Sequence, residues 1–195
     1  MPLHNYNLST GLKGLDTIIK GLLPGDNIVW QVPSIADYSH FVRPYAQFAA
    51  SREQRLVYFR FASHPPLLEG DEYPGLETCT LDPAEGFEPF ITAIHSIIKA
   101  HGRGGYYVFD SLSELAGLWY SDRMLGNFFM LTCPYLLDME ALAYFAVLRQ
   151  EHSHNALHPI HNTAQVIIDV YNNEGQLYVH PLKVQQRYSS TMHVL

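Results

Sequence analysis

The chain has 195 residues, 47% of them hydrophobic and 16% charged, which is enough apolar material for a core and too much for a disordered tail. Its length fits a single domain covering residues 1–195. The 19 acidic residues outnumber the 12 basic ones, and the formal net charge is −7. This balance argues against nucleic acid as a partner, because duplex binding needs clustered cations to neutralise phosphates.

Cysteine usage and hydropathy point to a reduced, cytoplasmic protein without a membrane partner. The only cysteines are Cys79 and Cys133, and the first ten residues have neither the basic nor the apolar region of a signal peptide. The longest apolar stretch, residues 125–137, is interrupted by polar residues and a proline. It is shorter than the roughly 20 apolar residues that span a bilayer.

The first half of the chain alternates between strand and helix patterns. Residues 27–32 (NIVWQV) predict a buried strand after a Pro-Gly-Asp turn. A helix is expected at roughly 37–52, where Pro44 should kink the helix or lie near its start. Strands are expected at 55–61 and 76–81. Asp82-Pro83-Ala84-Glu85 then resembles a helix cap, and Gly102 would end the helix that follows.

The second half continues the alternation and closes with a hairpin. We expect a strand at 106–109 that ends at Asp110, a helix at 122–138 and a buried strand at 141–148. Strands at 165–171 and 176–184 are joined by Asn-Asn-Glu-Gly, a good hairpin turn. The pattern predicts an α/β fold with a mostly parallel sheet, helices on both faces and a C-terminal antiparallel hairpin. Ligands of such sheets bind at the carboxyl ends of the strands.

Several segments resemble one superfamily in the right order along nearly the whole chain. Residues 9–16 (STGLKGLD) and the turn at 24–26 are similar to the opening motif of RecA/KaiC-type ATPases. Residues 106–112 (YYVFDSL) resemble their Walker B strand, and Leu182-Lys183-Val184 resembles the segment that ends in K-x-R. The resemblance implies a RecA-like three-layer αβα domain that assembles side by side with other copies.

The departures from this family concern the nucleotide site. In the family the first strand runs into a glycine-rich loop with a lysine, which hold the phosphates. Residues 33–40 (PSIADYSH) stand there without glycine or lysine. Ala62 and Ser63 replace the catalytic glutamate, and Gln185 replaces the arginine of K-x-R. The resemblance therefore implies degenerate nucleotide-site equivalents at Ser34, Asp37, Tyr38, Ser39, His40, Asp110, Ser111, Lys183 and Arg187.

These losses predict a domain that does not hydrolyse ATP, because phosphoryl transfer depends on positioning and charge stabilisation. We expect no catalytic residue, no cofactor and a docking, oligomerisation or regulatory role with a protein partner or a second copy. An alternative is a sensor that binds a nucleotide or another small anion without hydrolysis. Residues 25–32 and 182–189 also resemble the RecA-like N-terminal region of pyruvate phosphate dikinase or phosphoenolpyruvate synthase-like proteins. That likeness implies an accessory role in phosphotransfer.

Each candidate residue also has a structural interpretation. Asp110 is either a Mg²⁺-linked acid or a strand-end hydrogen-bond acceptor, and we favour the second. Ser34 or Asp37 would then cap a helix. Ser111 and Ser113 lie near Asp110, but the chain has no G-x-S-x-G motif, which argues against a serine hydrolase.

A histidine cluster follows the strand at 141–148. Its spacing could bring imidazoles around Zn²⁺, but Pro159 interrupts any continuous helix. We therefore expect a solvated polar loop and no metal, with zinc as the alternative. The residues concerned are His152, His154, His158 and His161.

Overall fold

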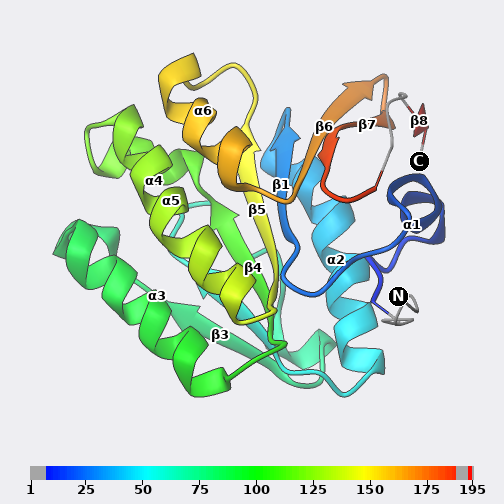
Figure 1. Cartoon of the computed structure of the whole chain (residues 1–195), viewed down its shortest axis with the longest axis horizontal. Helices are drawn as coiled ribbons and strands as arrows, with labels where there is room; N and C mark the ends of the chain where they lie inside the picture. Colours follow the sequence, from blue (N-terminus) through cyan, green and yellow to red (C-terminus); the bar gives the residue numbers. More distant parts are fainter. Residues whose placement is uncertain (1–7, 188–192, 195) are drawn as a thin grey trace.

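The computed structural model describes residues 8–187 and 193–194 and places all eight of its strands in one sheet (Figure 1). The strand order is β3-β2-β4-β5-β1-β6-β7-β8. Neighbours among the first six strands are parallel, whereas β6–β7 and β7–β8 are antiparallel. The strands are β1 (Asn27–Val32), β2 (Leu56–Arg60), β3 (Leu76–Thr80), β4 (Tyr106–Ser111), β5 (Leu142–Leu148), β6 (Val166–Asn173), β7 (Gln176–Val184) and β8 (His193–Val194).

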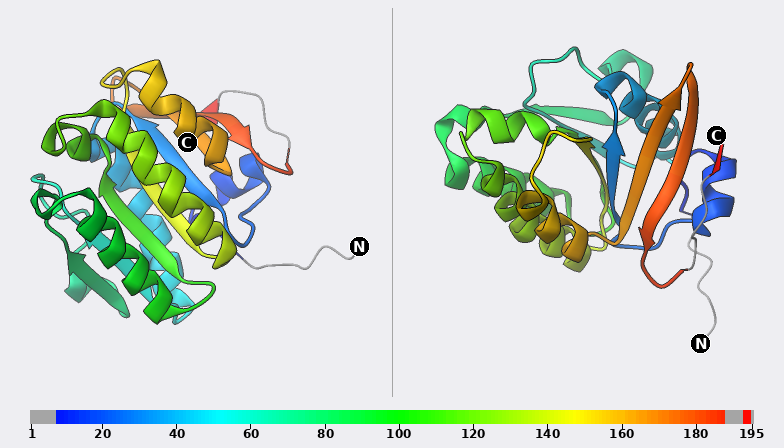
Figure 2. Two further views of the ribbon diagram at one scale, coloured as in Figure 1. Left: turned by 60° about the vertical axis from the view of Figure 1, so that its left-hand side comes forward. Right: turned by 90° about the horizontal axis from the view of Figure 1, so that it is seen from above.

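Helices cover both faces of this sheet, so the α/β prediction with its three layers and terminal hairpin is confirmed. Helices α1 and α2 pack on one face, and α3 to α6 pack on the other (Figure 2). The helices are α1 (Lys13–Ile19), α2 (Ile35–Ser51), α3 (Phe87–His101), α4 (Ser113–Leu118), α5 (Asp122–Asp138) and α6 (His154–Thr163). Among the described residues, no helix has the length and apolar character needed to cross a membrane.

Alternation along the central strands produces two cores, one on each face. In β5, Leu142 and Tyr144 join the core beneath α1 and α2, whereas Ala143 and Phe145 join the core beneath α3 to α6. Successive side chains of a strand point to opposite faces, so a strand covered on both sides must be apolar throughout. This requirement explains why β1 and β5 are nearly continuous apolar runs.

The motif at residues 9–16 is held together by hydrogen bonds to Asp16 and packs against helix α2 at Gly11. Asp16 accepts hydrogen bonds from the Ser9 hydroxyl, from Thr10 N at 2.8 Å and from Thr10 Oγ1 at 2.8 Å. Gly11 has φ +81°, and a Cβ there would lie 2.1 Å from the carbonyl oxygen of Pro44. Glycine is therefore required where the chain crosses α2. Pro44 lies inside α2, so of the two expected alternatives the position near the helix start is ruled out.

The structure corrects the expected elements in three other places. The first turn expected at 82–85 is a separate 3₁₀ turn, η2 (Pro83–Glu85), and α3 begins after it. Strand β4 continues through Asp110 to Ser111. The segment expected to be a polar loop contains helix α6, which Ser153 caps by accepting a hydrogen bond from Ala156 N. Residues 188 and 189, which contributed to the phosphotransfer resemblance, lie outside the described residues.

Candidate functional site

The carboxyl ends of β2, β4, β5 and β1 meet along one edge of the sheet, where ligands of parallel α/β sheets bind. Helix α2 leaves β1 on one face, whereas α6 leaves the neighbouring β5 on the opposite face. A pair of adjacent strands with such diverging connections is the usual position of a crevice. We therefore begin with the side chains at this edge.

Strand β1 is joined to α2 by only two residues, Pro33 and Ser34. The Ser34 hydroxyl accepts from Asp37 N at 3.2 Å and donates to Asp37 Oδ2 at 2.6 Å. The other carboxylate oxygen, Asp37 Oδ1, accepts from Asn172 Nδ2 of β6 at 2.7 Å. This connection is a capped helix start tied to the sheet, in agreement with the capping interpretation of Ser34.

The next side chains of α2 point in different directions. Tyr38 is fully buried, and its hydroxyl donates to the carbonyl oxygen of Phe109 at 3.4 Å. Ser39 donates to the carbonyl oxygen of Ala36 at 2.6 Å within the helix. His40 is exposed and lines a separate hollow beside the β6–β7 turn. These three side chains therefore do not converge on one pocket.

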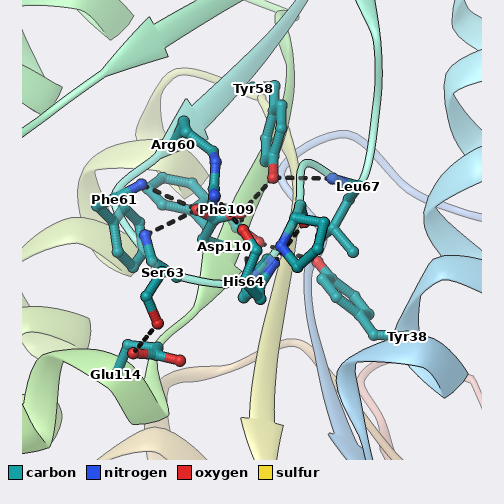
Figure 3. Close-up of polar contacts among 12 residues, drawn as sticks. Tyr38, Tyr58, Arg60, Phe61, Ser63, His64, Leu67, Phe109, Asp110 and Glu114 are labelled. Atoms are coloured by element: carbon teal, nitrogen blue, oxygen red, sulfur yellow. Dashed lines mark hydrogen bonds and ion pairs between the residues drawn. The ribbon is translucent and has the colours of Figure 1, made fainter.

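Asp110, at the end of β4, is fully buried and surrounded by donors (Figure 3). Its Oδ2 atom accepts from Arg60 Nη1 at 2.7 Å and from the backbone amides of Phe61 and Ala62, each at 2.9 Å. The hydroxyl of Tyr58 donates to Oδ1. Both carboxylate oxygens are thus engaged, and this arrangement fits the hydrogen-bonding interpretation of Asp110 better than the Mg²⁺ interpretation.

The same network anchors the segment that follows β2. Arg60 also donates to the carbonyl oxygen of His64, and Tyr58 Oη accepts from Leu67 N at 3.1 Å. Burial raises the pKa of Tyr58 well above its ordinary value, and the Asp110 carboxylate raises it further. The hydroxyl therefore stays protonated and remains a donor. Charge and hydrogen bonds together hold residues 61–67 over the strand ends.

A small cavity lies beside this segment. It has a volume of about 330 Å³ and lies between the first turns of α2 and residues 64–67. Ser39, Arg43 and His64 contribute polar groups to its wall, and Ile35 and Leu67 contribute apolar ones. The cavity reaches the lower end of the size range of small-molecule sites.

Lys183 and Arg187 lie far from Asp110, because β7 runs antiparallel to β6 and returns to the opposite end of the sheet. Lys183 Nζ donates to the carbonyl oxygens of His161 and Asn162 at 2.9 and 3.1 Å, which caps the end of α6. Burial lowers the pKa of Lys183. The structure does not bring Lys183 into the site that the resemblance implies.

Arg187 has a partner of its own at that opposite end. Its Nη2 atom contacts both carboxylate oxygens of Asp26 at 2.9 and 3.0 Å, and Nη1 donates to the carbonyl oxygen of Gly21. Asp26 belongs to the Pro-Gly-Asp turn that precedes β1. Arg187 therefore fastens the end of β7 to that turn instead of facing Asp110.

The four histidines of the zinc alternative do not converge. His152 lies between Asp122 and Ser113, and His161 Nε2 is 3.3 Å from Gln31 Oε1. His154 and His158 lie one helical turn apart, with ring centroids 5.8 Å apart and ring planes tilted by 60°. Across residues 8–187, no three His, Cys, Asp or Glu side chains are arranged to hold a metal ion.

The sequence did not predict the residues that form hydrogen bonds with Asp110 and Asp37. Arg60, Tyr58 and Asn172 gave no motif signal, although a charged Arg60 at the end of an apolar strand suggests a buried partner. Ser111 was expected beside Asp110, and it is buried; within the described part of the chain its hydroxyl has no hydrogen-bond partner. A one-residue register shift between β4 and β5 lies just before it.

Comparison with known proteins adds no family to this picture. No protein-family model matches the chain, and no curated protein matches its sequence. The RecA/KaiC resemblance therefore stays a prediction that rests on the order of the motifs in the sequence.

Proposed function

We propose that this chain is a non-hydrolysing RecA/KaiC-like domain that acts as a docking, oligomerisation or regulatory module. The observation that carries the proposal is the two-residue connection between β1 and α2. A phosphate cradle needs a longer loop whose successive backbone amides point at the ligand. Here Ser34 and Asp37 already occupy the helix start with their own hydrogen bonds.

Electrostatics at this edge support the same proposal. The Asp37 carboxylate is buried at the position that the resemblance assigns to the phosphates, where it would repel a triphosphate. Asp110, the Walker B equivalent, forms an ion pair with Arg60. Displacing that guanidinium with Mg²⁺ would leave a buried arginine without its partner, which is costly.

The docking part of the proposal rests on an exposed apolar surface along α5. Met130, Leu131 and Leu137 are 43%, 52% and 43% exposed and lie on the outward side of the helix. The helix carries no charged residue between Met124 and Leu137. Contiguous exposed apolar surface commonly marks a protein interface. A second copy of the chain is the first partner to test.

The proposal that the chain does not hydrolyse ATP is tested by an ATPase assay and by thermal stability. The purified chain is assayed for ATP hydrolysis with Mg²⁺, and its melting temperature is measured with ATP, ADP, AMP and phosphoenolpyruvate. We expect no turnover above background and no rise with ATP, because only a ligand that binds the folded state raises the melting temperature. Hydrolysis that Asp110→Asn abolishes in a folded protein would overturn the proposal.

The docking part is tested by light scattering across a range of concentrations. We expect self-association that Leu131→Glu abolishes. Leu182→Glu is the matched control, because Leu182 is a similarly exposed leucine on β7. A monomer at all concentrations would refute self-association and leave a different protein as the partner.

The cavity beside α2 favours a second candidate, the sensor. Arg43 and His64 line it together with apolar groups, a chemistry that suits a small anion with an apolar body. In that case one ligand of the thermal screen should raise the melting temperature, and Arg43→Ala should remove the rise. A rise that persists in Arg43→Ala would place the ligand elsewhere. A rise with phosphoenolpyruvate would favour the accessory role in phosphotransfer.

A further inference from the structure

Three side chains from separate segments form a hydrogen-bonded row on the face of the sheet covered by α3 to α6. Ser113 is the first residue of α4, Asp122 is the first residue of α5, and His152 lies between β5 and α6. His152 Nε2 is 2.6 Å from Ser113 Oγ, and His152 Nδ1 is 2.7 Å from Asp122 Oδ1. A hydroxyl, an imidazole and a carboxylate in this order are the components of an activated serine.

The hydrogen bonds determine how the imidazole is protonated. An ionised carboxylate only accepts, so Asp122 accepts a hydrogen bond from the Nδ1–H of His152, and the lone pair of Nε2 faces Ser113. Burial raises the pKa of Asp122, but hydrogen bonds from Ser153 and His152 outweigh burial and keep it below its ordinary value. Asp122 is therefore ionised at neutral pH, and Nε2 of the neutral imidazole can accept the Ser113 proton.

The surroundings of the row suit a reaction at Ser113. Its Oγ atom lies just beyond the end of β4 and accepts from Leu148 N, at the end of β5, at 2.8 Å. These are adjacent parallel strands, and their carboxyl ends are where such sheets bind ligands. The His152 side chain is only 3% exposed, which shields its hydrogen bonds from water.

Access to the hydroxyl is narrow and restricts the size of any substrate. Ser113 is 9% exposed. The next residue, Glu114, accepts from the Ser63 hydroxyl at 3.4 Å, as Figure 3 shows. A hydroxyl this buried can be reached only by a small group unless the chain moves.

We propose that Ser113 is a nucleophile for small activated carboxylic esters, with His152 as its general base and Asp122 as a positioning residue. Ser113 Oγ bonds to the carbonyl carbon while its proton moves to His152 Nε2. The ester C–O bond then breaks, and the alcohol leaves with that proton. Water hydrolyses the acyl-serine in the same manner, so the serine is restored and one carboxylic acid is released.

The test uses p-nitrophenyl acetate on the full chain. Nitrophenolate release is followed by absorbance, and acetylated residues are located by peptide mass spectrometry. We expect an initial burst, one acetyl group on Ser113 and loss of both in Ser113→Ala. Ser63→Ala is the matched control and should keep the burst, because the Ser63 hydroxyl donates to the Glu114 carboxylate and not to an imidazole.

Two further variants separate catalysis from a structural role. His152→Gln should slow acetylation about 100-fold or more, as is typical for loss of a general base. Asp122→Asn should slow it and move the midpoint of the pH–rate profile down, because the carboxylate stabilises the protonated imidazole. Melting curves confirm that each variant is folded. Acetylation confined to other residues, or an unchanged rate in folded His152→Gln, would overturn the proposal.

Discussion

Two buried aspartates, each paired with an arginine, lie at opposite ends of the sheet and are stabilised differently. Asp110 at the carboxyl end accepts two backbone amides, a tyrosine hydroxyl and Arg60. Asp26 at the amino end accepts one backbone amide, from Leu23 at 2.7 Å, and relies on both contacts to Arg187. The resemblance would place Asp110 and Arg187 in one nucleotide site. In the fold, Asp110 instead binds the segment that follows β2, and Arg187 binds Asp26 in the turn before β1.

The largest expected effect is at Asp110. Asp110→Ala leaves Arg60 and the amides of Phe61 and Ala62 without their buried acceptor, so we expect a loss of about 4 kcal/mol in the free energy of unfolding. Urea denaturation measures this loss. Asp138→Ala is the control at an exposed aspartate and should change stability by less than about 0.5 kcal/mol. A loss below about 1 kcal/mol at Asp110 would show that the network contributes little.

A smaller and pH-dependent effect is expected at Asp26. Burial raises the pKa of Asp26, and Arg187 offsets only part of that rise. Arg187→Met should cost about 3 kcal/mol at pH 7, because it leaves a buried carboxylate unpaired. Without the guanidinium the pKa rises further, so the folded state binds a proton that the unfolded chain releases. Stability of this variant should therefore fall as the pH rises above the ordinary aspartate value of 3.8.

Urea unfolding at pH 5 and pH 8 measures that slope. The double variant Arg187→Met with Asp26→Asn is the control, since it has no carboxylate to titrate and should show a flatter pH dependence. An equal loss at both pH values would mean that Asp26 does not take up a proton in the single variant.

The smallest expected effect on stability is at Ser34, the residue that caps the start of α2 at the carboxyl end of the parallel strands. Ser34→Ala removes the cap of the helix and should cost about 1 kcal/mol, whereas Ser34→Gly should cost only a few tenths. Thermal or urea unfolding of the two variants gives the difference. If alanine and glycine behave alike, the Ser34 hydroxyl does not act as a cap.

Most helices and strands followed from local patterns in the sequence. The bounds of three elements were predicted within a residue or two: the strands at 27–32 and 142–148 and the helix at 122–138. A buried strand or an amphipathic helix has a characteristic spacing of apolar residues, which can be recognised in a short stretch of sequence. The β6–β7 hairpin followed from the turn sequence Asn172-Asn173-Glu174-Gly175, and Glu174 and Gly175 have the positive φ that such a turn uses.

Helix α6 was missed because its stability comes from packing. Pro159 removes one helical hydrogen bond, but Ile160 is fully buried, and α6 packs tightly against α5 at Gly126. A Cβ at Gly126 would lie 3.0 Å from the Ala156 carbonyl oxygen. The expected polar loop was wrong for this tertiary reason.

By itself, the sequence determined the alternation of strands and helices, the closing hairpin and the absence of glycine and lysine from residues 33–40, since each depends on residues close together in the chain. The tertiary structure alone decided which side chains meet. Arg187 and Asp26 lie 161 residues apart, and His152 and Ser113 lie 39 apart. Strand order, register and helix packing bring such groups within hydrogen-bond distance, and these depend on the burial of the whole core.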